Sequence, residues 1–332
     1  MTAYSLLDLV PVAEGGTVAQ ALANAADLAR HAEGLGFSRY WVAEHHGMAG
    51  IASAATAVVI AHVAAATRSI RVGAGGIMLP NHAPLIIAEQ FGTLDALHPG
   101  RIDLGLGRAP GSDGRVAHAM RRTLDSDPNA FPRDVMELQS YFADDGRTGI
   151  VATPGAGADV SLWILGSSTF GAQLAAALGL PYAFASHFAP DQLDAALAIY
   201  RRDFRPSAQL ARPHAMAGFN VFAADTDEEA AFLASSQQQA FVALRTGRPG
   251  PLPRPVANYR QSLGAQGSAM LDQVLSCSAI GSPATVRRGI AAFVARTGVD
   301  EVMLTSAMWD HDARKRSLAI AAGAMVELAA AA

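Results

Sequence analysis

Strand-like and helix-like segments alternate along the whole chain, and this alternation constrains the fold more than any other feature. Short apolar runs bounded by glycine, proline and polar residues predict eight strands, at 4–10, 39–43, 70–80, 101–106, 160–165, 181–186, 214–223 and 299–306. Segments with apolar residues at helical spacing separate them. Eight such units within 332 residues predict one (β/α)8 TIM barrel domain spanning 1–332.

A doubly wound open sheet is the alternative architecture. It would more often show a Gly-x-Gly-x-x-Gly turn after the first strand, and Leu9-Val10-Pro11 does not match that motif. We therefore expect the closed barrel.

Local signals predict several helix starts and one irregular segment. Thr17, Ser53 and Thr226 precede helical patterns as N-caps, and Pro190 is expected to open a helix. The proline and glycine density of residues 245–266 predicts an insertion without regular structure, which is either a lid or a disordered segment.

Composition excludes several classes of protein. No run reaches the roughly 18 apolar residues of a membrane span, and the amino terminus reads as a first strand, not as a signal peptide. A net charge of −4 without a basic run argues against nucleic acid. Cys277 is the single cysteine, which excludes an internal disulfide and a cysteine zinc cluster, so we expect a cytoplasmic protein.

The barrel prediction makes the residues after each strand candidates for a site. Side chains at the carboxyl ends of barrel strands face the active site. The positions are Asp8, Glu44-His45-His46, Gly75-Gly76, Gly107-Arg108, Gly166-Ser167-Ser168, His187 and Thr305-Ser306.

Three of these positions suggest a bound group. Gly75 and Gly76 end a strand, where glycine permits close backbone approach to a flat ligand or, alternatively, a tight turn or bulge. Arg108 beside glycines suits a phosphate, or forms an ordinary ion pair. The segment 166–169, Gly-Ser-Ser-Thr, offers hydroxyls and helix amides to an anion, or is an ordinary N-cap.

The Glu44-His45-His46 segment offers an acid or base. Adjacent residues at a strand end point in opposite directions, so the two histidines have poor spacing for a metal, and we expect no metal site. One histidine is expected to face the mouth and the other to be structural. Asp103 lies within a strand, where an ion-pair role is expected.

These motifs together resemble the bacterial luciferase-like flavin monooxygenase superfamily, and its alkanal-monooxygenase-like branch in particular. The resemblance is carried by RYWVAEHH, IRVGAGGIMLPNHAPLIIAEQFGTLDALHPGRIDLGLGRAPG and the WILGSST…LGLPYAFAS strands, with weaker support from GSPATVRRGI…VDEVMLTS. It implies a (β/α)8 barrel that uses reduced FMN, with coenzyme F420 in a sister branch.

The resemblance also implies roles for individual residues. Gly75-Gly76 would form a cis peptide against the flavin ring, and Arg108 would bind the flavin phosphate together with Gly166, Ser167 and Ser168. His45 would support turnover. Gly107 and Ser167 stand where luciferase has a cysteine and a glutamate, so light emission and a fatty aldehyde substrate do not carry over.

The expected function is a monooxygenase that uses reduced FMN and O2 on a small organic substrate. The alternatives are an F420-dependent dehydrogenase and a flavin-binding relative without turnover. No nicotinamide fingerprint follows a strand, so we expect a separate NAD(P)H:flavin reductase. We also expect a homodimer.

Overall fold

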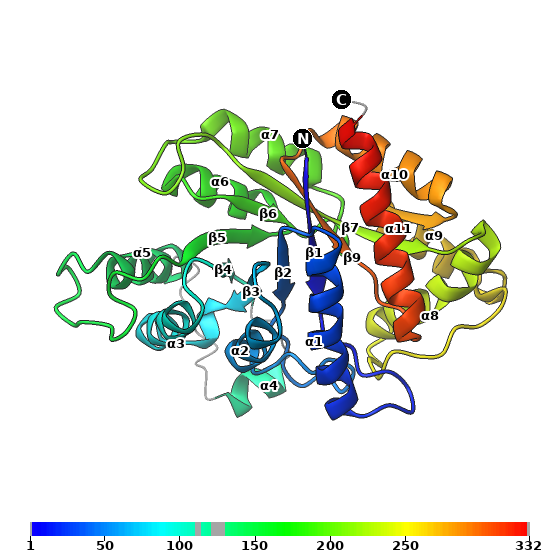
Figure 1. Ribbon diagram of the computed structural model, residues 1–332, viewed down its shortest axis with the longest axis horizontal. Helices are drawn as coiled ribbons and strands as arrows, with labels where there is room; N and C mark the ends of the chain where they lie inside the picture. The colour runs from blue at the N-terminus through cyan, green and yellow to red at the C-terminus, as the bar shows by residue number, and fades with distance from the viewer. Residues whose placement is uncertain (1, 110–113, 121–129, 331–332) are drawn as a thin grey trace.

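Parallel strands form a closed barrel at the centre of the molecule (Figure 1). The computed structural model describes residues 2–109, 114–120 and 130–330. The barrel strands are β1 (Ala3–Asp8), β2 (Arg39–Val42), β3 (Arg71–Met78), β4 (Ile102–Gly107), β5 (Ser161–Gly166), β6 (Tyr182–Phe184), β7 (Ala215–Ala223) and β9 (Glu301–Thr305). Neighbours pair in chain order, β7 pairs with β9, and the β6–β7 pairing closes the ring. The predicted (β/α)8 barrel is confirmed.

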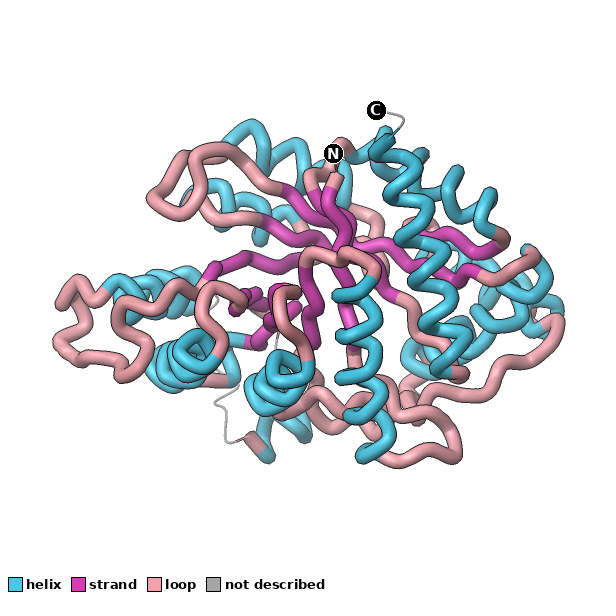
Figure 2. The backbone as a smooth tube through the Cα atoms, in the orientation of Figure 1, coloured by secondary structure: helices cyan, strands magenta, loops and turns pink. Residues whose placement is uncertain are grey.

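Helices surround the strands, as the cyan tubes around the magenta centre of Figure 2 show. They are α1 (Val18–Gly34), α2 (Thr56–Ala66), α3 (Pro84–Leu97), α4 (Gly114–Ala119), α5 (Ala130–Ala143), α6 (Thr169–Leu178), α7 (Leu193–Asp203), α8 (Asp227–Arg245), α9 (Ala265–Val274), α10 (Pro283–Thr297) and α11 (His311–Ala330). The short 3-10 turns η1 (Leu79–Asn81) and η2 (Tyr259–Ser262) join them.

Alternate residues of each strand face two different cores. Leu6, Val42 and Leu104 point outward into the large apolar core beneath the helices. Leu7 and Trp41 point inward and pack with Trp163, Ala183, Met216 and Met303 inside the barrel. This period-two pattern makes the barrel interior a packed core with its own side chains.

An ionic network fills the barrel at the amino-terminal ends of its strands. The Asp103 carboxylate, 0% exposed, accepts hydrogen bonds from Arg39, Arg71 and the Trp41 indole at 2.8, 2.8 and 3.0 Å. Arg39 also reaches Glu301 at 3.1 Å, and Ser5 and His214 bind the same carboxylate. We call these residues with Trp163, which packs against Arg39, the floor network. The ion-pair role expected of Asp103 is confirmed.

Two of the predicted helix caps are present and one is not. The side chains of Thr17 and Thr226 accept hydrogen bonds from the third residue that follows each of them. Ser53 is not an N-cap, because its hydroxyl donates to the carbonyl oxygen of Ala43 and α2 begins later, at Thr56. Pro190 likewise lies before the start of α7 at Leu193.

The late proline- and glycine-rich segment is more regular than its composition predicts. It contains η2, and α9 begins before residue 266. Leu252 also bridges to Ala13, beyond the carboxyl end of β1. A further strand, β8 (Ser278–Gly281), was not expected and pairs with the second half of β7, outside the closed ring. Backbone pairing therefore holds the segment on the barrel.

Among the described residues, no helix has both the length and the apolar character needed to cross a membrane.

Candidate active site

A mostly apolar pocket lies inside the barrel, toward the carboxyl ends of the strands. Trp41 and Leu7 form part of its wall, and Trp41 packs edge-on against Trp163 with ring centroids 5.1 Å apart. We call this the barrel pocket; its lining residues are Leu7, Trp41, Gly75, Leu165, Ala183, Phe184, Ala185, His187, Met216, Gly218 and Met303. Such a lining suits a flat apolar group with few polar contacts.

Gly75 and Gly76 lie in the second half of β3, and glycine is needed at each position for a different structural reason. The Gly75–Gly76 peptide bond is cis, as expected. A Cβ at Gly75 would meet the Trp41 ring at 2.8 Å, so glycine keeps this wall of the barrel pocket bare. A Cβ at Gly76 would instead collide with the carbonyl of Gly105 on β4. Glycine at position 76 therefore allows β3 and β4 to pair closely.

Glu44, at the end of β2, holds several polar groups together. Its buried carboxylate accepts from His46 Nε2 at 2.7 Å, from His82 Nε2 at 2.9 Å and from the Met78 N–H at 2.9 Å. Burial would raise the pKa of Glu44, but these bonds outweigh it and lower that pKa. An ionised Glu44 thus ties the β2 and β3 ends together.

This arrangement separates the two adjacent histidines. The His46 ring is committed to Glu44, which is the structural role expected of one member of the pair. His45 is half-buried, and its charge contributes to lowering the pKa of His187, whose ring lines the barrel pocket. Of the two histidines, His45 is thus the one whose charge acts on a residue of the barrel pocket, although His45 does not itself line that pocket. His82, the second histidine on Glu44, carried no sequence motif that would have identified it.

Arg108 and the loop after β5 come together. The exposed Arg108 guanidinium stacks on the ring of Phe170, with 4.0 Å from Cζ to the ring centroid. Phe170 lies in the first turn of α6, which begins at Thr169, directly after Gly166, Ser167 and Ser168. Ser168 is the N-cap residue, but its side chain makes no capping hydrogen bond. The Arg108 cation thus lies beside the amino-terminal turn of α6, the helix that Ser167 and Ser168 precede.

His187 follows β6 and lies against β7. Burial, and secondarily the charge of His45, lower the pKa of His187 to about 4. At neutral pH its imidazole is therefore uncharged. Among the described residues, its Nδ1 is one of the buried side-chain atoms without a hydrogen-bond partner.

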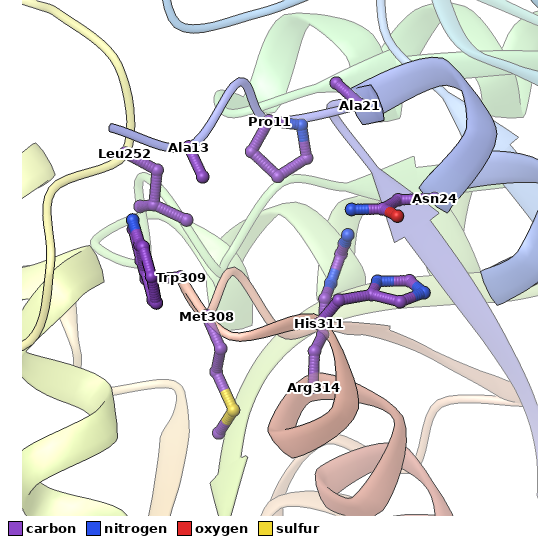
Figure 3. A pocket seen from close by; sticks show the side chains of 9 residues that line it. All are labelled: Pro11, Ala13, Ala21, Asn24, Leu252, Met308, Trp309, His311 and Arg314. Atoms are coloured by element: carbon purple, nitrogen blue, oxygen red, sulfur yellow. The ribbon is translucent and has the colours of Figure 1, made fainter. Parts of the chain in front are cut away.

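Asp8 and Ser306 do not face the site, contrary to expectation. Asp8 points outward, where it binds Arg314 of α11 at 2.8 Å and accepts from the Tyr40 hydroxyl. Ser306 is buried against Ser317 of the same helix. Figure 3 shows Arg314 in a second pocket, with Leu252 beside Trp309 on one side and Asn24 near His311 on the other. This outer pocket shares no lining residue with the barrel pocket.

No group of three or more histidine, cysteine, aspartate or glutamate side chains in the described residues could hold a metal ion.

A closed barrel with polar side chains gathered at the carboxyl ends of its strands is the architecture of a barrel enzyme. The family described as "Luciferase-like monooxygenase" matches residues 3–301. A "Luciferase-like monooxygenase" of Escherichia coli (strain K12) is 51% identical over 327 residues, 98% of each chain. The solved structure of apo-MsnO8 is 33% identical, with a TM-score of 0.88 over 98% of this chain and 99% of that chain. The chain belongs to the luciferase-like monooxygenase family.

The names of other similar proteins point to different substrates and cofactors. "N-acetyl-S-alkylcysteine monooxygenase" of Bacillus subtilis (strain 168) is 35% identical over 255 residues, 75% of each chain. The oxygenating constituent of 3,6-diketocamphane monooxygenase, solved with FMN, is 17% identical over 96% of each chain with a TM-score of 0.69. An F420-dependent secondary alcohol dehydrogenase is 15% identical over 97% of this chain and 98% of that chain, with a TM-score of 0.65. The last two likenesses show the fold alone.

Proposed function

We propose that this protein is a flavin-dependent monooxygenase that uses reduced FMN and O2 to oxygenate a small organic substrate. The observation that carries the proposal is Arg108 stacked on Phe170, beside the first turn of α6. This cluster supplies a guanidinium, helix amides and the hydroxyls of Ser167 and Ser168, which together suit a terminal phosphate.

The barrel pocket suits the ring system of the same cofactor. Its walls are apolar, and Gly75 leaves one of them without a side chain. The Arg108 cluster and the apolar barrel pocket both belong to the carboxyl ends of the barrel strands, as a site for one flavin nucleotide would require. Bound reduced FMN would supply the electrons that activate O2.

The chain's own residues would contribute positioning, dryness and proton transfer. Leu7, Trp41 and Met303 exclude water from the barrel pocket, which favours reactions of water-sensitive species. His45 is the group we assign to proton transfer, since His46 is held by Glu44. A separate NAD(P)H:flavin reductase would supply reduced FMN.

The experiment is a comparison of cofactor retention. The purified protein is mixed with FMN or with F420, desalted, and assayed for the retained cofactor by absorbance. Retention of FMN, followed by O2 uptake when reduced FMN is added, supports the proposal. Retention of F420 alone would replace the proposal with an F420-dependent dehydrogenase. Rapid anaerobic bleaching of bound FMN by NADH or NADPH would show that no separate reductase is needed.

A further inference from the structure

The imidazole of His187 occupies the space that a side chain at position 218 would fill. Gly218 lies on β7, two residues after Met216, which points into the barrel. A Cβ at Gly218 would collide with Nδ1 of His187. Glycine at 218 therefore makes room for a histidine that comes from the neighbouring strand's loop.

Two hydrogen bonds fix this histidine on β7. The Ser186 hydroxyl donates to the carbonyl of Gly218 at 2.6 Å, and the Asn220 amide donates to the carbonyl of His187 at 2.8 Å. The β7 partners of these bonds are Gly218 and Asn220. Ser186 and the backbone of His187 are thus both held on β7, which limits where the His187 ring can lie.

The held ring presents one particular edge to the barrel pocket. Nδ1 is turned to the Gly218 backbone, is buried, and lacks a hydrogen-bond partner among the described residues. In an imidazole, Nε2 lies on the side of the ring away from Nδ1 and Cγ. Since His187 lines the barrel pocket, its Nε2 edge is the one available to a ligand there.

The surroundings also select one form of the ring. Burial and the charge of His45, the titratable group whose charge acts on His187, disfavour the imidazolium. A neutral imidazole carries one N–H and one lone pair. Nδ1 lacks a partner in either tautomer, but a buried N–H without an acceptor is less tolerated than a bare lone pair, and an Nε2–H can still meet an acceptor in the barrel pocket. The proton therefore belongs on Nε2, toward the barrel pocket.

We propose that His187 is a cofactor-contacting residue, which donates its Nε2–H to a hydrogen-bond-accepting atom of the flavin ring in the barrel pocket. This inference rests on the proposed function. It assigns His187 the role of a neutral donor that orients the ring, separate from the proton transfer assigned to His45.

The first test measures FMN affinity by fluorescence titration. His187→Phe keeps a ring of similar shape and removes the donor, so we expect binding to be weaker by about three- to tenfold, the scale of one hydrogen bond. His187→Gln, which retains an N–H donor, should recover most of the affinity. His62→Phe, on the exposed face of α2, is the matched control and should bind FMN as the unmodified protein does.

A second variant covers the case in which His187→Phe does not fold. Gly218→Ala leaves His187 in the chain but pushes its ring away from β7, and it should weaken FMN binding to a similar extent. FMN affinities within twofold of the unmodified protein in the folded variants would overturn the inference.

The third test reads the ring itself, without activity. In protein labelled with 15N-histidine, long-range proton–nitrogen spectra at pH 7 should show His187 as the neutral Nε2–H form, and added FMN should shift its Nε2 signal. A protonated or Nδ1–H ring, or an Nε2 signal that bound FMN leaves unchanged, would contradict the inference. If the unmodified protein binds no FMN, both the proposed function and the His187 inference fail. If it binds FMN and the His187 variants bind it equally well, only the His187 inference fails.

Discussion

At the scale of single residues, the segment after β2 shows how the Glu44 carboxylate gives two adjacent histidines different roles. Glu44 is buried, and its pKa is lowered by its histidine and backbone partners, so it remains ionised at neutral pH. It holds His46 and His82 by their Nε2 atoms. His45, between Glu44 and His46, instead acts through its charge on His187.

This division predicts opposite results for the two histidines. His45→Ala should retain FMN binding and lower turnover by about 100-fold, the usual scale for a general acid–base group. His46→Ala should mainly lower the stability of the β2 end, seen as a lower Tm. Turnover with saturating reduced FMN and thermal unfolding measure the two effects. A large loss of turnover in His46→Ala with none in His45→Ala would reverse the assignment.

Arg108 gives a second prediction at this scale. Arg108→Ala should weaken FMN binding by at least tenfold, because a charge-assisted hydrogen bond contributes about 1.5–3 kcal/mol. Arg68→Ala, another exposed arginine, is the control and should change nothing in a fluorescence titration. Riboflavin, which lacks the phosphate, should bind the Arg108 variant and the unmodified protein alike; a loss with riboflavin would place Arg108 elsewhere than at the phosphate.

At the scale of elements, Glu33 joins the end of α1 to the start of β3. Its Oε1 accepts three successive backbone N–H groups, from Arg68, Ser69 and Ile70, at 2.9, 2.6 and 3.0 Å. Burial acts to raise the pKa of Glu33, but these bonds lower it to about 2, from an ordinary 4.5. Glu33 of α1 thereby provides a hydrogen-bond acceptor for the backbone N–H groups that lead into β3.

The lowered pKa predicts a pH-dependent contribution to stability. Because the folded pKa lies below the unfolded one, the contribution is fully present above about pH 4.5 and is lost as the pH falls toward 2. Glu33→Gln should cost about 1 kcal/mol in urea unfolding at pH 7 and less at pH 3.5. Glu89→Gln, on α3, is the matched control. An equal loss at both pH values would contradict the account.

Local sequence patterns predict the eight barrel strands well. They predict poorly the features that depend on contacts between distant segments, such as β8. Apolar runs and helical spacing are properties of single elements, so the eight barrel strands could be predicted from them. β8 is four residues long and is stabilised by pairing with β7, which no local pattern encodes. For the same reason, the sequence indicated Arg108 and the segment 166–169 separately, whereas the stacking of Arg108 on Phe170 could not be predicted from it.

At the scale of the whole molecule, the floor network connects strands that are far apart in the sequence. It joins β1, β2, β3, β4 and β9 through Ser5, Arg39, Arg71, Asp103 and Glu301. Buried charges of this kind are costly when one partner is missing, because the remaining charges have lost both water and their counter-ion. The ring of strands therefore depends on every member of the network.

Asp103→Asn should therefore destabilise the whole barrel. The change keeps the volume but leaves Arg39 and Arg71 without their shared anion, at a cost of about 3–5 kcal/mol. Denaturant unfolding, followed by tryptophan fluorescence because Trp41 binds the same carboxylate, would measure it. Asp312→Asn, on the exposed start of α11, is the control. A loss below 1 kcal/mol would show that the network is dispensable.

The floor network also determines the direction from which small molecules can enter the barrel. Side chains fill the barrel at the amino-terminal ends of its strands, so we infer that a ligand reaches the barrel pocket only by a passage from the carboxyl ends of the strands. Whatever occupies the deepest position must arrive first and depart last. Two ligands that share this passage cannot bind in random order. Steady-state kinetics should consequently follow an ordered sequence, with the later-binding ligand trapping the earlier one.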